Sequence, residues 1–360
     1  MIRTTLFAPL LLVAVAVAVS VTFLGCGNFE DVTTVIDLRT VAIKAAKPEI
    51  QIDLNQPDAP YSATLTALVM DPAGAGRPVS YEVIACPREL DTVTAATGRA
   101  GAICKPYDPN SAEVDRSVPV TAAGGPAMTA PGAGPEHQIV LPDFAFPRDL
   151  LERALMLDPF AALGFPSAII FQLTISAGAE SETAIKRVVF SIPPAGHPDQ
   201  PPNANPEITQ VVSYRERDAA GMPIDEQPLP PADPTMPEPP PVLMVPLGRS
   251  VWIEPRGAAA ESYYTPVLTR GSMPSIIVEQ IPRETLRFAF FASAGKFAPP
   301  TTSTEPLPIF GPTERIHLES RYTAPAVMPE NPQVTFWIVA RDERGGTSWS
   351  RRTLLLVNPP

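Results

Sequence analysis

Apolar and polar residues alternate with a period of two over much of the chain after residue 34. In the stretch 61–69 the odd positions are apolar and most even positions are polar, which is typical of a strand with one buried face. The same pattern returns at 79–86, after a turn-forming cluster. Segments 168–176 and 183–192 alternate on either side of a short turn and predict a β-hairpin.

One segment breaks this pattern and predicts a helix over 147–163, between strands at 137–141 and 168–176. Pro147 suits the first turn of a helix, and Leu150, Leu151 and Ala154 lie on one apolar face. We expect this helix to cover an edge of the first domain.

A Pro-rich stretch divides the chain in two. Residues 193–206 hold six prolines and no apolar period, so 196–205 is interpreted as a semi-rigid linker that few contacts cross. A second Pro-rich stretch, 218–246, is interpreted as an insertion or exposed loop. The second half otherwise predicts strands at 208–214, 251–254, 286–292, 316–322, 334–341 and 353–357.

Two segments of the second half resemble immunoglobulin-like modules. Residues 334–346 resemble the penultimate strand and turn of PKD or cadherin-like modules, and 286–295 resembles an earlier core strand, with Phe288 and Phe290 in place of the usual Trp. The resemblance implies an all-β chain of two immunoglobulin-like β-sandwich domains, 34–195 and 206–360. The first domain carries the short inserted helix, and the loops are rich in Pro.

The N-terminus predicts export. Arg3 precedes an uncharged run at 6–24, and Gly25 and Cys26 follow. Residues 23–26 resemble the lipobox of bacterial lipoproteins. That resemblance implies a signal peptide at 1–25, lipidation of Cys26 with fatty-acyl chains, a tether at 26–33, and, with Gly27 in second place, location at the outer membrane. The alternative is a retained N-terminal membrane span. Both interpretations place 27–360 outside the cytoplasm.

The composition limits the classes of partner, and the cysteine content favours a disulfide. The net charge of −11 argues against nucleic acid, and 47 Pro against 21 Gly favours strands joined by rigid turns. Cys86 and Cys104 form an even pair in an oxidising compartment, which favours a disulfide. Two thiolates without a third ligand make a metal site the weaker interpretation.

No catalytic, cofactor or metal motif is found, and the three histidines are scattered. His197 lies in the linker, His317 alternates on a predicted strand, and His137 begins one. A convergent hydrolase site is the alternative from another class. Carbohydrate binding is a further alternative, for which the candidate aromatic residues are Trp252, Tyr263, Tyr264, Trp337 and Trp349.

These observations predict a non-catalytic, lipid-anchored envelope protein that binds a protein or polysaccharide partner or serves a structural role. The candidate contact surface is the turn 342–346, with Asp342, Arg344 and the nearby Trp349; Gly345 and Gly346 allow the chain to reverse. The alternative is a solubilising turn with Trp349 against the sheet. Because Trp337 and Val339 oppose Phe336 and Ile338 on one strand, we also expect one of these pairs to lie outside the main core or under a covering element.

Overall fold

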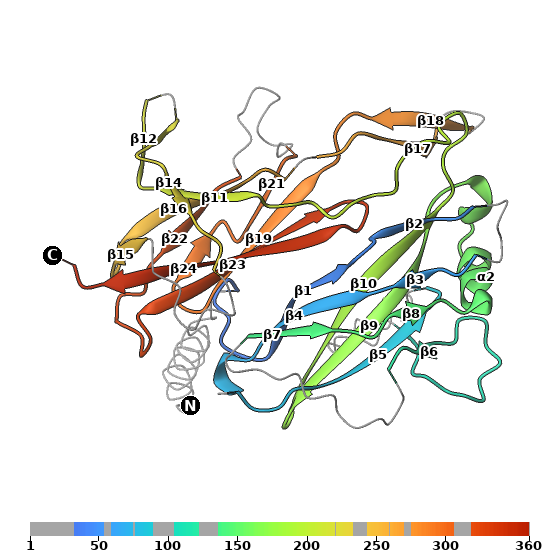
Figure 1. Cartoon of the computed structure of the whole chain (residues 1–360), viewed down its shortest axis with the longest axis horizontal. Coiled ribbons are helices and arrows are strands. Elements are labelled where there is room, and N and C mark those ends of the chain that lie inside the picture. Colours follow the sequence, from blue (N-terminus) through green and yellow to red (C-terminus); the bar gives the residue numbers. More distant parts are fainter. Residues whose placement is uncertain are drawn as a thin grey trace, which may run out of the picture.

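Two β-sandwiches make up the described part of the chain, as a computed structural model shows (Figure 1). The structure describes residues 32–53, 59–74, 76–88, 104–121, 136–219, 221–232, 243–258, 260–269, 275–305 and 318–359. Over these residues the fold is all-β with one short α-helix, as the sequence predicts. Among the described residues, no helix is long and apolar enough to cross a membrane.

The first sandwich packs a three-stranded sheet against a five-stranded sheet. The order of the smaller sheet is β1 (Arg39–Ala45), β4 (Leu65–Met70), β7 (Glu136–Val140). The order of the larger is β2 (Glu49–Gln51), β10 (Glu180–Ser191), β9 (Ser167–Ala177), β5 (Ser80–Cys86), β6 (Val118–Pro119). A small ribbon pairs β3 (Ser62–Ala63) with β8 (Phe144–Ala145). Strands β9 and β10 form the predicted hairpin, and residues such as Leu65 and Phe171 bury their side chains between the sheets.

The helix is shorter than the sequence predicts. Helix α2 spans Arg148–Leu157, and a separate 3-10 turn, η3, spans Ala161–Leu163. Pro159 explains the break, because the residue before a proline is forced out of the helical conformation, and Asp158 is extended. Leu150 and Ala154 pack into the core of the first sandwich, so the helix covers part of that core.

The second sandwich packs two five-stranded sheets. One has the order β14 (Gln227–Leu229), β11 (Gln210–Tyr214), β16 (Ser250–Arg256), β22 (Ser320–Thr323), β20 (Lys296–Ala298). The other has the order β15 (Met244–Pro246), β24 (Thr347–Val357), β23 (Gln333–Asp342), β19 (Leu286–Ala292), β21 (Thr301–Ser303). Phe288 and Phe290 lie in its core, where the family resemblance places them.

The stretch 218–246 contains more structure than its prolines suggest. Strand β13 (Pro223–Ile224) pairs with β12 (Glu216–Arg217), β14 pairs with β11, and β15 pairs in parallel with β24. The prediction of a simple insertion or exposed loop is therefore wrong for these residues. A proline is compatible with an edge strand, where its missing N–H faces away from the neighbouring strand. Residues 233–242 lie outside the described part.

The side chains on the two faces of β23 pack into different cores. Phe336 and Ile338 belong to the core of the second sandwich, whereas Trp337 and Val339 belong to a separate buried cluster shared with the first domain. Of the two alternatives that the sequence leaves open for this strand, the structure has the covered face, and the covering element is the first domain.

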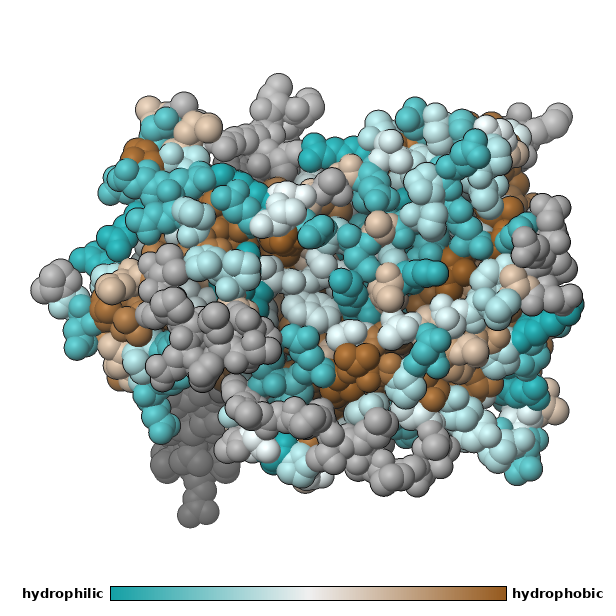
Figure 2. All heavy atoms as spheres, in the orientation of Figure 1, coloured by the Kyte–Doolittle hydropathy of each residue, from teal (hydrophilic) through white to brown (hydrophobic). Residues whose placement is uncertain are grey.

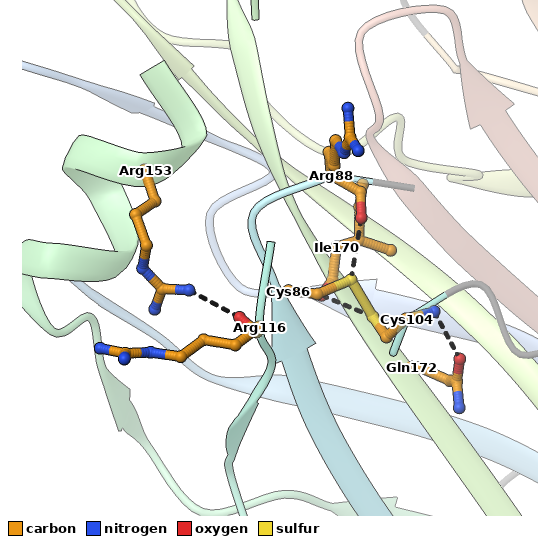
Figure 3. The surroundings of a disulfide bond; sticks show 7 residues. All are labelled: Cys86, Arg88, Cys104, Arg116, Arg153, Ile170 and Gln172. Atoms are coloured by element: carbon orange, nitrogen blue, oxygen red, sulfur yellow. Dashed lines mark hydrogen bonds between the residues drawn. A yellow bond between two sulfur atoms is a disulfide. The ribbon is translucent and has the colours of Figure 1, made fainter. Parts of the chain in front are cut away.

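Cys86 and Cys104 form the predicted disulfide (Figure 3). Both sulfurs are buried with Ile84 and Ile170, and the Cys104 backbone N–H donates to Gln172 Oε1 at 2.9 Å. The bridge therefore fixes Cys104 against strands β5 and β9.

Candidate functional site at the domain junction

The two domains meet through an apolar cluster. Strand β23 contributes Trp337 and Val339, and Phe291 and Trp349 pack at its margin. The first domain contributes Val41, Ala42, Leu68 and Met70, and Val35, whose backbone N–H donates to Ala292 of the second domain, completes the cluster. This contact removes large apolar side chains of both domains from water, which stabilises it.

Polar groups pair across the boundary beside this cluster. Trp337 Nε1 donates to Glu136 Oε2 at 3.2 Å, and Arg351 Nε lies 2.8 Å from the same oxygen. On another side, Arg341 donates to the backbone oxygen of Val41 at 3.0 Å. Glu136 and Val41 belong to the first domain, so the junction has paired polar groups around an apolar centre.

The turn after β23 inserts Arg344, whose side chain is 11% exposed, among groups from both domains. Arg344 forms an ion pair with Glu49 of β2, lies 3.4 Å from Glu261, and stacks over the ring of Tyr263 at 4.5 Å. Glu49 is itself buried and accepts the backbone N–H of Asn203 at 2.8 Å. A buried ion pair of this kind is stable only when both partners stay in place.

Asp342 organises the turn that carries Arg344. It accepts the backbone N–H groups of Gly346 at 2.6 Å and Arg344 at 2.9 Å, and the side-chain amide of Asn203. Burial raises the pKa of Asp342, while these hydrogen bonds pull the pKa down. Gly345 has φ of 95°, but Gly346 is required for space, because a Cβ there would lie 1.9 Å from Asp342 Oδ2.

Lys186 of β10 reaches the same turn from the first domain. Its Nζ donates to the backbone oxygen of Gly345 at 2.5 Å and to Thr347 Oγ1 at 2.8 Å. Burial lowers the pKa of Lys186 to about 8, and the carboxylate of Asp342 opposes that shift. The lysine therefore ties β10 to the turn through two hydrogen bonds.

The linker is held in the junction. Asn205 donates to the backbone oxygen of Ala45 at 2.8 Å and accepts the Thr347 N–H at 2.8 Å. Asn203 and Asn205 thus contact both domains. The expectation that few contacts cross at 196–205 is wrong, because the asparagines between the prolines use their side chains to bridge the domains.

The first described residues belong to the second domain. Thr34 forms a parallel bridge with Ala292, Ala292 N–H donates to Thr33 O at 2.8 Å, and Phe297 N–H donates to Thr33 Oγ1 at 2.9 Å. We call residues 33–35 the N-terminal strap. The sequence-based boundary differs here, since it ends the tether at 33 and begins the first domain at 34.

The sequence-predicted contact residues lie together at this junction. Asp342 and Arg344 occupy the turn and Trp349 packs at the edge of the apolar cluster, but they contact the first domain of the same chain. The surface expected to meet an external partner is therefore already occupied. Trp349 packs against other side chains, as the alternative interpretation expects.

A cleft of about 200 Å³ lies next to Arg344 and contains two of the candidate aromatic residues. Tyr263 carries the guanidinium of Arg344 on its ring, and its hydroxyl donates to Glu343 at 2.8 Å. Tyr264 stacks against His197 with ring centres 3.4 Å apart. In each case one ring face is covered by a neighbouring side chain.

The other residues singled out from the sequence lie apart from the cleft. Trp252 carries Arg217 over its ring at 4.6 Å. His137 is buried in β7, and its Nδ1 has no hydrogen-bond partner among the described residues. His317 and Cys26 lie outside the described residues.

Sequence reasoning missed Lys186, Glu49 and Asn203. Each sits in a segment whose local pattern predicts an ordinary exposed polar residue. The signal that could have found them is the second apolar face of β23, which requires a covering surface and therefore buried polar partners at its edge.

Comparisons with known proteins add little to this picture. No family model matches the chain, and no curated protein matches it. Among solved structures, native E. coli alpha-2-macroglobulin aligns with a TM-score of 0.19 and 10% identity over 92% of this chain and 17% of that one. Extracellular domains 3–5 of Drosophila OTK align with a TM-score of 0.16 and 9% identity over 91% of this chain and 100% of that one. The fold assignment therefore rests on the strand pairing of the chain itself.

Proposed function

We propose that this chain is a non-catalytic, lipid-anchored protein of the cell envelope whose two immunoglobulin-like domains act as one rigid binding or structural body. The observation that carries the proposal is the buried polar junction of Lys186, Arg344 and Glu49. Separating the domains would leave these charges without partners, which costs several kcal/mol for a buried ion pair. A fixed arrangement of this kind suits a spacer or scaffold.

The N-terminal strap gives the anchor a defined point of attachment. Thr33 is buried and hydrogen-bonded in the second domain, seven residues after Cys26. Seven residues span at most about 25 Å when fully extended. An acyl anchor on Cys26 would therefore hold the second domain close to the membrane, and the first domain with it.

The aromatic residues support a protein-contact or structural role over carbohydrate binding. Sugar sites present a free aromatic face to the ring of the sugar. Here Arg344 covers one face of Tyr263, His197 covers one face of Tyr264, and Trp337 is buried in the junction. These rings already serve contacts within the chain.

The anchor is tested by changing Cys26→Ala in the full chain. We expect fatty-acid labelling to be lost and normal maturation to stop, because the acylated thiol is gone. A Cys86→Ala/Cys104→Ala variant is the matched control and should keep its label. Labelling that persists in Cys26→Ala would overturn the lipid anchor.

The mode of action is tested by crosslinking the native chain in its own envelope and identifying its neighbours by mass spectrometry. We expect discrete protein neighbours, whose capture falls in the Cys26→Ala variant. Hydrolysis of envelope polysaccharide or peptide by the purified protein would contradict the non-catalytic role.

A further inference from the structure

Prolines lie on several of the sheet edges in the described part of the chain. The edge strands β6, β14 and β15 each contain one, at Pro119, Pro228 and Pro246. An open sheet edge invites pairing with another chain, and Pro or a basic residue on that edge prevents it. This accounts for part of the high proline content, and it makes an unprotected edge informative.

A ribbon that the sequence did not predict leaves the second sandwich and reaches over the first (Figure 1). It pairs β17 (Tyr263–Leu268) with β18 (Ile276–Ile281). Its outer strand, β18, contains neither Pro nor Lys nor Arg. Among the edge strands of the described residues, β18 is the longest that contains none of these three residue types.

The two edges of the ribbon differ in whether their backbone groups have hydrogen-bond partners. On β17, the side-chain amide of Gln200 accepts the Tyr264 N–H at 2.6 Å and donates to the Tyr264 oxygen at 3.1 Å. Gln200 therefore occupies the place of a neighbouring strand. Pro266 removes a further donor from that edge.

The outer edge of β18 is open. Because Tyr264 directs its backbone groups away from β18, alternation places the N–H and C=O groups of Ile276, Val278 and Gln280 on the outer edge. In the described part of the chain, no backbone group pairs with them. The strand is exposed nearly throughout, with Ile277 47% and Val278 36% exposed. On the face of the molecule shown in Figure 2, hydrophilic and hydrophobic residues both reach the surface.

We propose that β18 is a self-association site, at which the β18 strands of two copies of this chain pair antiparallel about a two-fold axis at Val278. Each copy would exchange the Val278 N–H and C=O groups with the other, and Ile276 would face Gln280. The two ribbons would form one four-stranded sheet. A two-stranded ribbon is marginal by itself, and additional strands stabilise it.

Charge favours a second copy as the occupant. Glu279 is the single charged residue of β18. In the two-fold register it faces Ile277 of the other copy, so the two carboxylates never lie opposite each other. Such self-complementarity is the property that a two-fold interface requires.

Two cysteine variants of the full chain test the register. Val278→Cys places two thiols on residues about 5.5 Å apart between Cα atoms, within disulfide range. Gln280→Cys is the matched control, since its two copies would be about 14 Å apart along the strand. We expect Val278→Cys to give a reducible dimer on a non-reducing gel, and Gln280→Cys and the native chain to stay monomeric there. Equal crosslinking of both variants, or none, would overturn the proposal.

A proline variant tests the pairing itself. The N–H of Val278 points away from β17, so Val278→Pro leaves the ribbon intact and removes the central donor of the proposed interface. We expect the solution mass of the native chain, measured by sedimentation, to be twice that of Val278→Pro. A native chain that sediments as a monomer contradicts the proposal, whatever the outcome for the lipid anchor.

Discussion

Lys186 shows how one residue acquires a function that its neighbours in sequence do not indicate. It lies on β10 between residues that alternate as in any strand, yet the second domain buries its ammonium group. The turn supplies a backbone oxygen and a hydroxyl, and the charge of Arg341 faces it unfavourably while Asp342 faces it favourably. Removal from water dominates, so the pKa of Lys186 falls to about 8.

This shift predicts a pH dependence of stability. Between pH 8 and 10.5 the unfolded chain keeps the proton of Lys186 and the folded chain does not, so the free energy of unfolding rises with pH in this window. The slope is about 1 kcal/mol per pH unit. We expect Lys186→Met to lose this slope between pH 8 and 9.5, measured by denaturant unfolding at each pH.

The exposed Lys296 supplies the control. Lys296→Met should keep the slope of the native chain, since Lys296 lies on the surface. An equal slope in the native chain and Lys186→Met would show that the lysine keeps its proton in the folded state.

At the scale of elements, the turn between β23 and β24 forms part of the contact between the two domains. Its sequence is typical of a solvated turn with mixed charge, but most of the turn is enclosed by groups of both domains. The difference lies in what it meets: Glu49 from β2, Lys186 from β10 and Asn203 from the linker. A turn that reverses tightly can enter a narrow space between two sheets, and Gly346 makes that tight reversal possible.

The disulfide joins the end of β5 to Cys104. Cys104 and Cys86 are 18 residues apart, and the bridge fixes Cys104 to the larger sheet of the first sandwich. We expect Cys104→Ser to lower the free energy of unfolding by about 3 kcal/mol, because the unfolded chain gains the entropy of an open loop. Urea unfolding of the variant and of the native chain measures the loss.

Reduction of the native chain is the matching control and should produce the same decrease. A Cys104→Ser variant with an unchanged urea midpoint would mean that the loop is restrained by other contacts.

At the scale of the whole molecule, the junction makes the two sandwiches interdependent. The strap of residues 33–35 contacts the second domain, the linker contacts both domains, and the turn after β23 contacts the first domain. Domains joined by such contacts should unfold together. We expect a single calorimetric transition for the native chain.

The variant Arg344→Glu should separate this transition into two. It places a third carboxylate beside Glu49 and Glu261, which are buried or half-buried, and removes the charge that balances them. Arg321→Glu makes the same charge change at an exposed position of β22 and should keep one transition. Two transitions in the native chain would contradict the coupling.

Much of the fold follows from local pattern. Alternation predicts the β9–β10 hairpin, β5, β19 and β23, because each strand must bury one face and its side chains alternate regardless of what lies opposite. The sequence also predicts the disulfide, because Cys86 and Cys104 remain as an even pair once Cys26 is assigned to the expected lipobox. The ribbon β17–β18 escaped notice because neither strand alternates between buried and exposed residues: β17 is half-buried nearly throughout and β18 is exposed nearly throughout.

The pattern of β23 predicts two apolar faces, one of which lies outside the main core or under a covering element. The packing of the two sandwiches places the first domain over that face, and it makes Lys186, Arg344 and the linker asparagines the polar border of the contact. The reason is distance along the chain. Lys186 and Gly345 are 159 positions apart. Their hydrogen bond depends on the packing of two complete sandwiches, whereas the period of a strand depends only on its own backbone.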